Sequence, residues 1–207
     1  MKFNDHSNLE GKHAFMGASK YNWLNYDDDT FEERYINQYA ATIGELLHNL
    51  ACNMIRNQVK LRKCDKNLIR MHLLTNGIPK QFIKADKWLP TLMNYINDAI
   101  DLRMTPEVIL FYSNNCFGKT DCIYVDDKTI RIHDLKTGSA PVHIEQLLIY
   151  CALYCLEYFV SPEDKNVELR IYQNEDIIYH NPTAEEIESI KRIIVERDSY
   201  INHVILR

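Results

Sequence analysis

Two aspartates near the middle of the chain have a spacing that suits metal-assisted chemistry. Asp121 begins one predicted strand and Asp134 ends the next. Antiparallel strands joined by a short turn can bring such positions side by side, and adjacent carboxylates repel unless a cation or a proton lies between them. Because hard carboxylate oxygens suit Mg²⁺ or Mn²⁺, the pair is a candidate site for either ion.

A lysine completes this group. Lys136 follows Asp134 by two residues, so on an extended chain both side chains point to the same face. An ammonium beside a bound metal can position a water or stabilise the negative charge that develops on a phosphate. Charged residues are common near strand ends, however, and a surface ion pair explains the same Asp-x-Lys spacing. The residues alone leave both interpretations open.

The first half of the chain is predicted to be helical. Apolar residues recur at helical spacing over 32–58. Gly44 inside this helix indicates close packing, because a mid-helix glycine costs about 1 kcal/mol relative to alanine. Residues 60–103 predict two or three further helices, broken near 76–79 and at Pro90.

The second half is predicted to contain the sheet. Five segments have strand composition: 107–112, 121–125, 129–135, 167–172 and 176–179. The first three are joined by short turns and predict an antiparallel meander. An apolar helix is predicted over 142–159. A last helix is expected to run to about Val204, because Thr183 and Glu186 have capping-box spacing at its start.

This order of elements predicts an α/β fold. We expect a mixed sheet with an antiparallel meander, flanked by helices and preceded by a helical N-terminal half. At 207 residues a single domain is the default, with a mostly helical part at 1–103 and a sheet-containing core at 104–207.

Composition narrows the class of protein. Apolar residues make up 46% and charged residues 26%, as in ordinary soluble proteins. No apolar run reaches the roughly 18 residues of a membrane span, and the N-terminal residues lack a secretory signal, so we expect a cytoplasmic protein without membrane partners. The net charge of −5 does not advertise a nucleic-acid binder, although a nuclease needs only a local basic path. Cys151 and Cys155 are interpreted as buried thiols in preference to metal ligands.

Several short motifs follow one another in a specific order. They are Ser19-x-x-x-Trp23-Leu24, Gly44-x-x-x-His48, Gly118-x-x-Asp121, Asp134-Leu135-Lys136-Thr137-Gly138 and Gln146-x-x-x-Tyr150. The set resembles the RecB-like branch of the PD-(D/E)XK nuclease superfamily over about residues 15–160. That resemblance implies a restriction-endonuclease-like core and a Mg- or Mn-dependent deoxyribonuclease. Such nucleases are typically exonucleases that phages and mobile elements use in recombination or DNA processing, which would place this chain in the host cell cytoplasm.

The resemblance also implies a set of metal ligands. Asp121 and Asp134 would bind Mg²⁺ or Mn²⁺ through their carboxylates, and His48 would be the third side-chain ligand. The backbone carbonyl of Leu135 would complete the protein's share. A lone histidine on an amphipathic helix is more often a packed core residue, so His48 depends on the family pattern for this role. No cysteine follows Cys155, so the iron–sulfur cluster of some relatives is not expected.

Further residues receive catalytic roles from the same resemblance. Lys136 would position or activate the attacking water. Gln146 and Tyr150, four apart and therefore on one face of a helix, would orient the lysine or the substrate phosphate. Glu45, one turn before His48, would reach the metal or its waters. Glu107 is an alternative acidic site residue, although an exposed strand carboxylate is the simpler interpretation.

The expected partners follow from these roles. DNA, linear or single-stranded, would be the substrate, with a recombination or replication protein as a further candidate partner. Two other functions stay open: a catalytically inactive nuclease-like module that binds DNA or protein, and an RNA endonuclease with a similar histidine, acidic and lysine set. The chain departs from relatives at Asp134, where glutamate is common, and in the short interval between Lys136 and Gln146.

Overall fold

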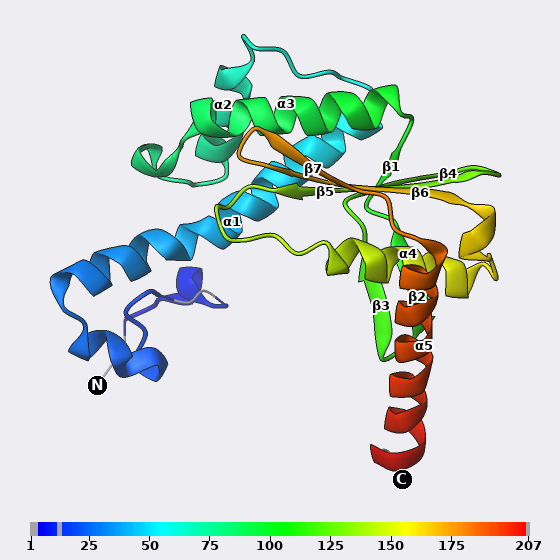
Figure 1. The fold of residues 1–207 in the computed structure, drawn as a ribbon. Coiled ribbons are helices and arrows are strands. Elements are labelled where there is room, and N and C mark those ends of the chain that lie inside the picture. Colours follow the sequence, from blue (N-terminus) through cyan, green and yellow to red (C-terminus); the bar gives the residue numbers. More distant parts are fainter. Residues whose placement is uncertain (1–3, 12–13, 206–207) are drawn as a thin grey trace. The chain divides into compact units, whose positions relative to one another are not determined.

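The computed structural model describes residues 4–11 and 14–205. The chain divides into two compact units, residues 1–43 and 44–207. The boundary falls inside the long helix α1 (Asp28–Arg56), which confirms the helix predicted at 32–58. The first unit also holds two short 3-10 helices, η1 (Ser7–Leu9) and η2 (Ala18–Asn25) (Figure 1).

A mixed five-stranded sheet forms the centre of the second unit. Its strand order is β1-β4-β5-β6-β7. The strands are β1 (Thr105–Pro106), β4 (Cys122–Val125), β5 (Thr129–Lys136), β6 (Asn166–Gln173) and β7 (Asp176–His180). Only β5 and β6 run parallel, and helix α4 (Glu145–Glu157) lies between them in sequence. A parallel pair needs such a crossover, whereas the other strands turn back directly.

The predicted three-stranded meander is wrong in its first strand. β2 (Ile109–Ser113) pairs with β3 (Cys116–Lys119) in a separate two-stranded sheet, and β4 instead has β1 and β5 as its neighbours. Asn114 and Asn115 therefore turn the chain back on β2, where the sequence predicts a turn into a strand at 121–125. The hairpin between β4 and β5 is confirmed.

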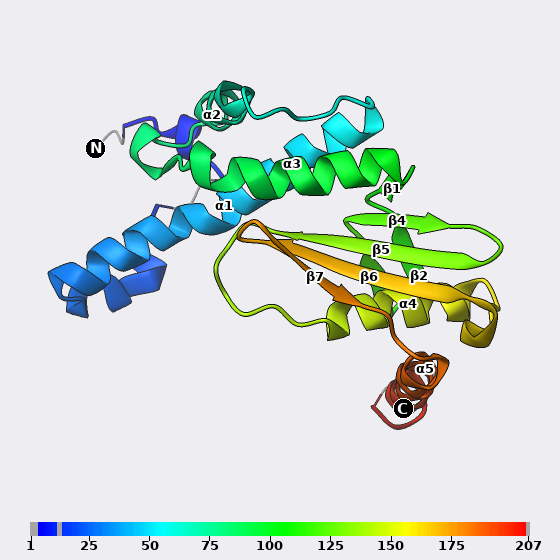
Figure 2. The same ribbon diagram turned by 45° about the horizontal axis from the view of Figure 1, so that its top comes forward.

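Helices cover both faces of the main sheet. Figure 2 shows α3 (Ala85–Asp101) over one face and α4 over the other, with α5 (Ala184–Tyr200) beside α4. α2 (Lys66–Thr75) packs on α3, and short turns are found at η3 (Lys80–Phe82), η4 (Pro162–Asp164) and a final π-helical turn (Ile201–Ile205). Within the described part of the chain, no helix has the length and apolarity needed to cross a membrane.

The predicted break at Pro90 is wrong, because α3 continues through it. Proline removes one backbone donor and strains the preceding turn. Here Pro90 lies in the second turn of the helix, and the apolar stripe that follows is fully buried at Leu92, Ile96 and Ala99. Burial of that stripe outweighs the cost of a single lost hydrogen bond.

The start of α5 and the turn between β4 and β5 are both fixed by side chains. Thr183 and Glu186 form the predicted capping box, each accepting from the other's backbone N–H. In the hairpin, Asp126 Oδ1 accepts from the backbone N–H groups of Lys128 (2.9 Å) and Thr129 (2.7 Å). Tyr124 Oη also donates to Asp126 Oδ2. Local hydrogen bonds of this kind favour the turn over extended alternatives.

A polar network lies between the sheet and α3. Arg131 Nε donates to Glu168 Oε1 at 2.7 Å, and Arg170 Nε is ion-paired with the same oxygen at 2.8 Å. Tyr172 donates to Asp98 on α3 at 2.7 Å and lies 3.3 Å from His133 Nδ1. Burial, together with the charges of Arg170 and Arg131, lowers the pKa of His133 to about 2, so His133 is neutral.

Candidate active site

The register of the β4–β5 hairpin sets the two aspartates against each other. Cys122 pairs with His133 at the end of the ladder. One residue further along, Asp121 lies opposite Asp134, and residues directly opposite on antiparallel strands share a face of the sheet. Asp134 also shares a face with Ile132, which packs in the core beneath α4, so the carboxylate of Asp134 is buried.

Backbone contacts fix the position of Asp121. Thr120 N donates to the carbonyl of Val108 at 2.8 Å, and Glu107 N donates to the carbonyl of Asp121 at 3.0 Å. The carboxylate itself accepts from the backbone N–H of Leu135, with 2.8 Å between Leu135 N and Asp121 Oδ2. The strand that carries Asp134 therefore also holds the second carboxylate in place.

His48 reaches this pair from α1. Its Nδ1 lies 3.2 Å from Asp121 Oδ1. One turn earlier, a Cβ atom on Gly44 would lie 3.3 Å from Thr137 Oγ1, which is tighter than ordinary contact. The glycine therefore lets α1 approach the end of β5 closely, in agreement with the close packing predicted for it. His48, four residues on, is on the same side of the helix.

A chain of hydrogen bonds leads from Asp134 to α4. Lys136 Nζ lies 2.9 Å from Asp134 Oδ2 and donates to Gln146 Oε1 at 2.9 Å. Gln146 Nε2 in turn donates to Tyr150 Oη at 3.2 Å. The ring of Tyr150 packs on Gly118, where a Cβ atom would lie only 2.7 Å from a ring carbon. Glycine is thus the residue type that leaves room for the Tyr150 ring at position 118.

Burial and like charge act together on Asp134. Burial and, after it, the neighbouring charge of Asp121 raise the pKa of Asp134 to about 6, against the opposing effect of Lys136. The pKa of His48 is also raised: burial lowers it, but the hydrogen bond to Asp121 and the charges of both aspartates outweigh burial. Both shifts reflect two carboxylates that are held close together.

Other predicted site residues lie apart from this group. Glu45 is exposed on α1 and has no hydrogen bond or ion pair with any residue that the structure describes. Glu107 is not the exposed strand carboxylate that the sequence favours. It lies between β1 and β2 with φ 56°, is half-buried, and accepts from Lys119 (2.7 Å), Arg56 (3.2 Å) and Cys52. Glu107 therefore links α1 to β3. Its position in the sequence does not reveal this role.

Three basic residues that follow α1 are paired with carboxylates. Lys60, Arg62 and Lys66 pair with Asp101, Asp65 and Asp86 respectively. These ion pairs are exposed to solvent. The two cysteines of α4, Cys151 and Cys155, are buried, as predicted.

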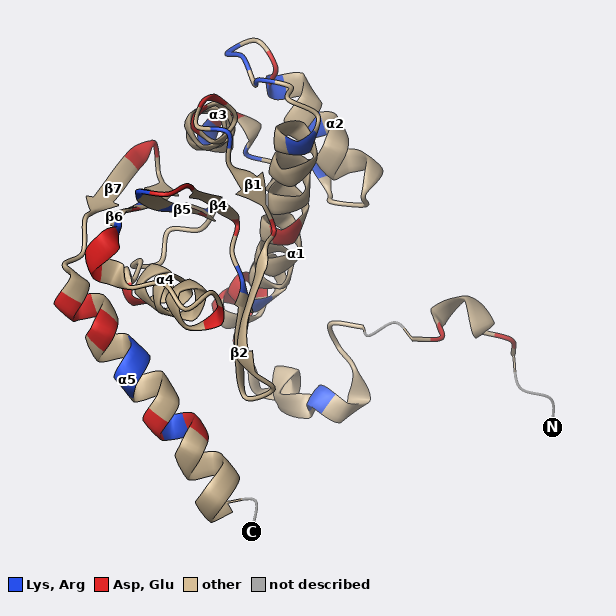
Figure 3. Cartoon of the chain, turned by 90° about the vertical axis from the view of Figure 1, so that its right-hand side faces the viewer, with Lys and Arg blue, Asp and Glu red and all other residues tan. Residues whose placement is uncertain are grey.

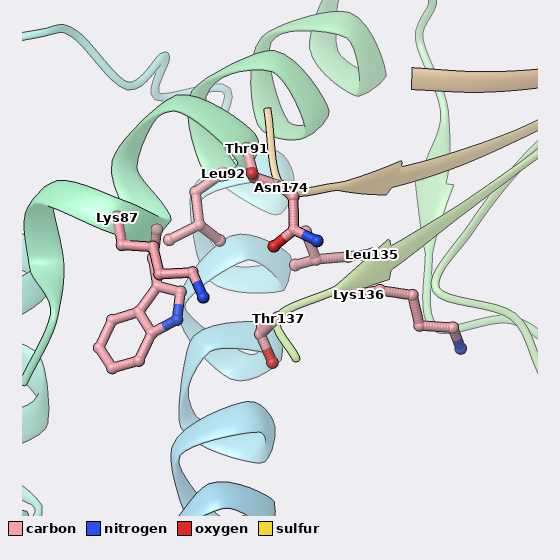
Figure 4. A pocket seen from close by; sticks show the side chains of 8 residues that line it. Lys87, Thr91, Leu92, Leu135, Lys136, Thr137 and Asn174 are labelled. Carbon is pink, nitrogen blue, oxygen red and sulfur yellow. The ribbon is translucent and has the colours of Figure 1, made fainter. Parts of the chain in front are cut away.

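A small pocket lies beside β5, next to the site. Lys87 and Trp88 of α3 line it together with Thr137 and Asn174 (Figure 4). Lys136 also lines the pocket, but the figure shows its ammonium pointing away from it. Its volume of about 10 Å³ leaves room for a single water at most.

The chemistry of the donor set fits the divalent cation that the resemblance implies. Two carboxylates and one imidazole nitrogen suit Mg²⁺ or Mn²⁺ in type. Asp134 Oδ2 is buried and accepts no hydrogen bond, although it is ion-paired with Lys136 Nζ. Among the described residues, no three acidic, histidine or cysteine side chains are already gathered as metal ligands. Internal pairs occupy the donors, so a cation would have to displace His48 from Asp121 or Lys136 from Asp134.

Comparison with known proteins gives a family and no activity. No curated protein matches the sequence. One family model, described as a protein of unknown function (DUF2800), matches residues 13–190. That range covers most of the chain and includes all the side chains of the candidate site, from His48 to Tyr150. The chain therefore belongs to the DUF2800 family.

Proposed function

We propose that this protein is a metal-dependent nuclease with a PD-(D/E)XK-type core that hydrolyses DNA phosphodiester bonds. One observation carries the proposal: His48, Asp121, Asp134 and Lys136, which come from a helix and two strands, form a single contiguous cluster. Chance surface charges would be scattered over these elements, and a buried carboxylate facing another carries a repulsion that a bound cation removes.

Each side chain has a task in this reaction. Asp121, Asp134 and His48 hold the cation, assisted by the carbonyl of Leu135, whose own N–H already lies against Asp121. A bound Mg²⁺ or Mn²⁺ supplies a water of lowered pKa and neutralises charge on the phosphate. Lys136 donates to the oxygen on which negative charge develops.

Two residues of α4 hold the lysine in place. Gln146 accepts a hydrogen bond from Lys136 and donates one to Tyr150, so the ammonium has a fixed direction before substrate arrives. Fixed donors of this kind need little reorganisation during the reaction. Glu45 is exposed and lies apart from these side chains, so a role at a water of the cation rests on the resemblance alone.

Cleavage of labelled DNA tests the proposal. Linear duplex, circular duplex, single-stranded DNA and RNA are incubated with Mg²⁺, Mn²⁺ or EDTA. We expect DNA cleavage with either metal and none with EDTA. Asp134→Asn and Lys136→Gln should abolish it. Asp176→Asn, a carboxylate of the same sheet outside the cluster, serves as the matched control and should cut at the wild-type rate.

Two results would contradict the proposal. Cleavage by Asp134→Asn at the wild-type rate would show that a contaminant or another site cuts the DNA. A correctly folded wild type that binds DNA but cuts nothing with either metal would favour the inactive binding module. Preferential cleavage of RNA would keep the metal site and change the substrate to that of an RNA endonuclease.

A further inference from the structure

The β2–β3 hairpin presents an apolar face to solvent. Phe111 and Phe117 are cross-strand partners, 44% and 61% exposed, with ring centroids 6.5 Å apart and planes at 29°. Ile109, two residues from Phe111, is 61% exposed on the same face and pairs with Lys119. In Figure 3 the whole length of β2 is free of charged residues. We call these four residues, Ile109, Phe111, Phe117 and Lys119, the hairpin face.

The opposite side of the hairpin is firmly held. Leu110 is buried in the core, and Gly118, its cross-strand partner, carries the ring of Tyr150. Phe111 N donates to Glu157 of α4 at 2.8 Å. At the tip, Ser113 Oγ donates to Asp198 of α5 at 2.6 Å. Two helices thus fix the hairpin, and the exposed rings are ordered before any partner binds.

Two cationic side chains, Lys119 and Arg56, lie at the end of the hairpin that is nearest the active site. Lys119 is two residues from Asp121, and both Lys119 and Arg56 contact the single carboxylate of Glu107. Both cations share that one carboxylate, and their side chains stay 53% (Arg56) and 55% (Lys119) exposed. A partner on this face would therefore present flat apolar groups beside negative charge.

We propose that the hairpin face binds single-stranded DNA, with unpaired bases stacked on Phe117 and Phe111 and the backbone beside Lys119 and Arg56. Stacking on exposed aromatic rings beside a basic path is how proteins hold single strands without reading sequence. A duplex does not offer its base faces to such a surface. The inference rests on the proposed nuclease function, and it makes a single strand the substrate that leads into the site.

Binding without cleavage tests the hairpin face independently of catalysis. Fluorescence anisotropy is measured in EDTA with a labelled oligothymidylate of about 20 nucleotides and with a duplex of the same length. Phe111→Ala and Phe117→Ala should each weaken single-strand binding about tenfold and leave duplex binding unchanged. Phe159→Ala removes another exposed phenyl ring, outside the hairpin face, and should have no effect.

Two further variants separate stacking from general apolar contact. Phe117→Tyr keeps an aromatic ring and should keep single-strand binding, whereas Phe117→Leu keeps apolar area and should lose binding as alanine does. Melting temperatures of all variants should match the wild type, because the rings are exposed. Wild-type affinity in Phe117→Ala, or no single-strand binding by the wild type, would overturn the proposal.

Self-association is the competing outcome. If the wild type sediments as a dimer that Phe117→Ala and Phe117→Tyr both dissociate, the hairpin face is a contact between copies and the proposal is wrong. The two proposals fail separately. Loss of single-strand binding in the alanine variants, in a wild type that never cuts, keeps the hairpin face and removes the nuclease. If the wild type cuts DNA with metal and the alanine variants bind single strands as tightly as the wild type, the nuclease proposal stands and the hairpin face is wrong.

Discussion

Gly118 illustrates how one missing side chain can place another. A Cβ atom at this position would lie 2.7 Å from the ring of Tyr150, and the ring holds Gln146, which holds Lys136. We therefore expect Gly118→Ala to displace the ring, to lower cleavage activity and to reduce the free energy of unfolding by about 1–3 kcal/mol, the usual cost of overpacking. Denaturant unfolding measures the loss of stability.

A second substitution tests whether the ring is the cause. In a Tyr150→Ala background the added methyl group meets no ring, so Gly118→Ala should cost much less stability there. Gly138→Ala is the matched stability control, because a Cβ atom there has no neighbour within 4 Å. An equal loss of stability from Gly118→Ala in both backgrounds would mean that the alanine acts on something other than Tyr150.

Asp134 should lower stability in the absence of metal. Its pKa of about 6 lies above the unfolded value, so at pH 8 the folded state carries a charge that it disfavours. Asp134→Asn removes that charge and should raise the free energy of unfolding in EDTA by up to about 3 kcal/mol. Saturating Mn²⁺ should raise the melting temperature of the wild type and of Asp176→Asn, but not of Asp134→Asn. A variant less stable than the wild type in EDTA would contradict the repulsion.

The order of the sequence motifs predicts which residues form the cluster. Strand periodicity predicts that Asp121, Asp134 and Lys136 lie together but leaves a surface ion pair open. The resemblance assigns them to a metal site, and it alone adds His48, since helical spacing makes that residue a core histidine. The role of Glu107 was not accessible. Its partners Arg56 and Lys119 lie far along the chain, and its left-handed backbone conformation is not visible in composition.

Among the elements, short strands were the hardest to predict. β3 spans only Cys116–Lys119 and contains Gly118, a residue depleted in strands, so its composition indicates a turn. Tertiary contact with Tyr150 overrides that preference. α3 shows the converse case, in which a strong local signal at Pro90 is overridden by burial of one helix face. β5 and α5 were predicted well because pattern, turn and cap agree.

Glu168 belongs to the polar network between the sheet and α3, and its carboxylate predicts acid sensitivity. Burial raises the pKa of Glu168, but hydrogen bonds from Arg131 and Arg170 outweigh burial and hold the pKa below 4.5. A lowered folded-state pKa adds stability above the unfolded value, and that stability is lost as the pH falls. Unfolding free energy should therefore decrease on acidification below about pH 4.5.

Glu168→Gln isolates this contribution. The variant shares every other titrating group with the wild type, so the difference in unfolding free energy between them measures Glu168 alone. At pH 7 the variant should be less stable by about 1–3 kcal/mol, because two arginines lose their shared carboxylate. The difference should shrink as the pH falls below 4.5. A difference that stays constant down to pH 3 would show that the carboxylate is not favoured by its charge.

For the molecule as a whole, net charge gives little guidance to function. The chain carries −5, and acidic and basic residues are mixed along α5 (Figure 3). Two of the acidic residues lie in the cluster itself, where the resemblance assigns them to a cation. The local arrangement of charged side chains is therefore a better guide to function than the net charge, and the cations paired with Glu107 are a second example.

The β4–β5 turn has a consequence for the order in which the fold forms. Asp126 closes a local hairpin, and local contacts form faster than those that require long loops to close. Asp126→Ala should therefore slow refolding with little change in the unfolding rate. His48→Ala, which removes a contact from a distant helix, should leave refolding unchanged. Stopped-flow tryptophan fluorescence measures both rates, and faster unfolding as the main effect of Asp126→Ala would contradict this order. A partly folded chain would thus hold the carboxylates of Asp121 and Asp134 together before His48 packs against them.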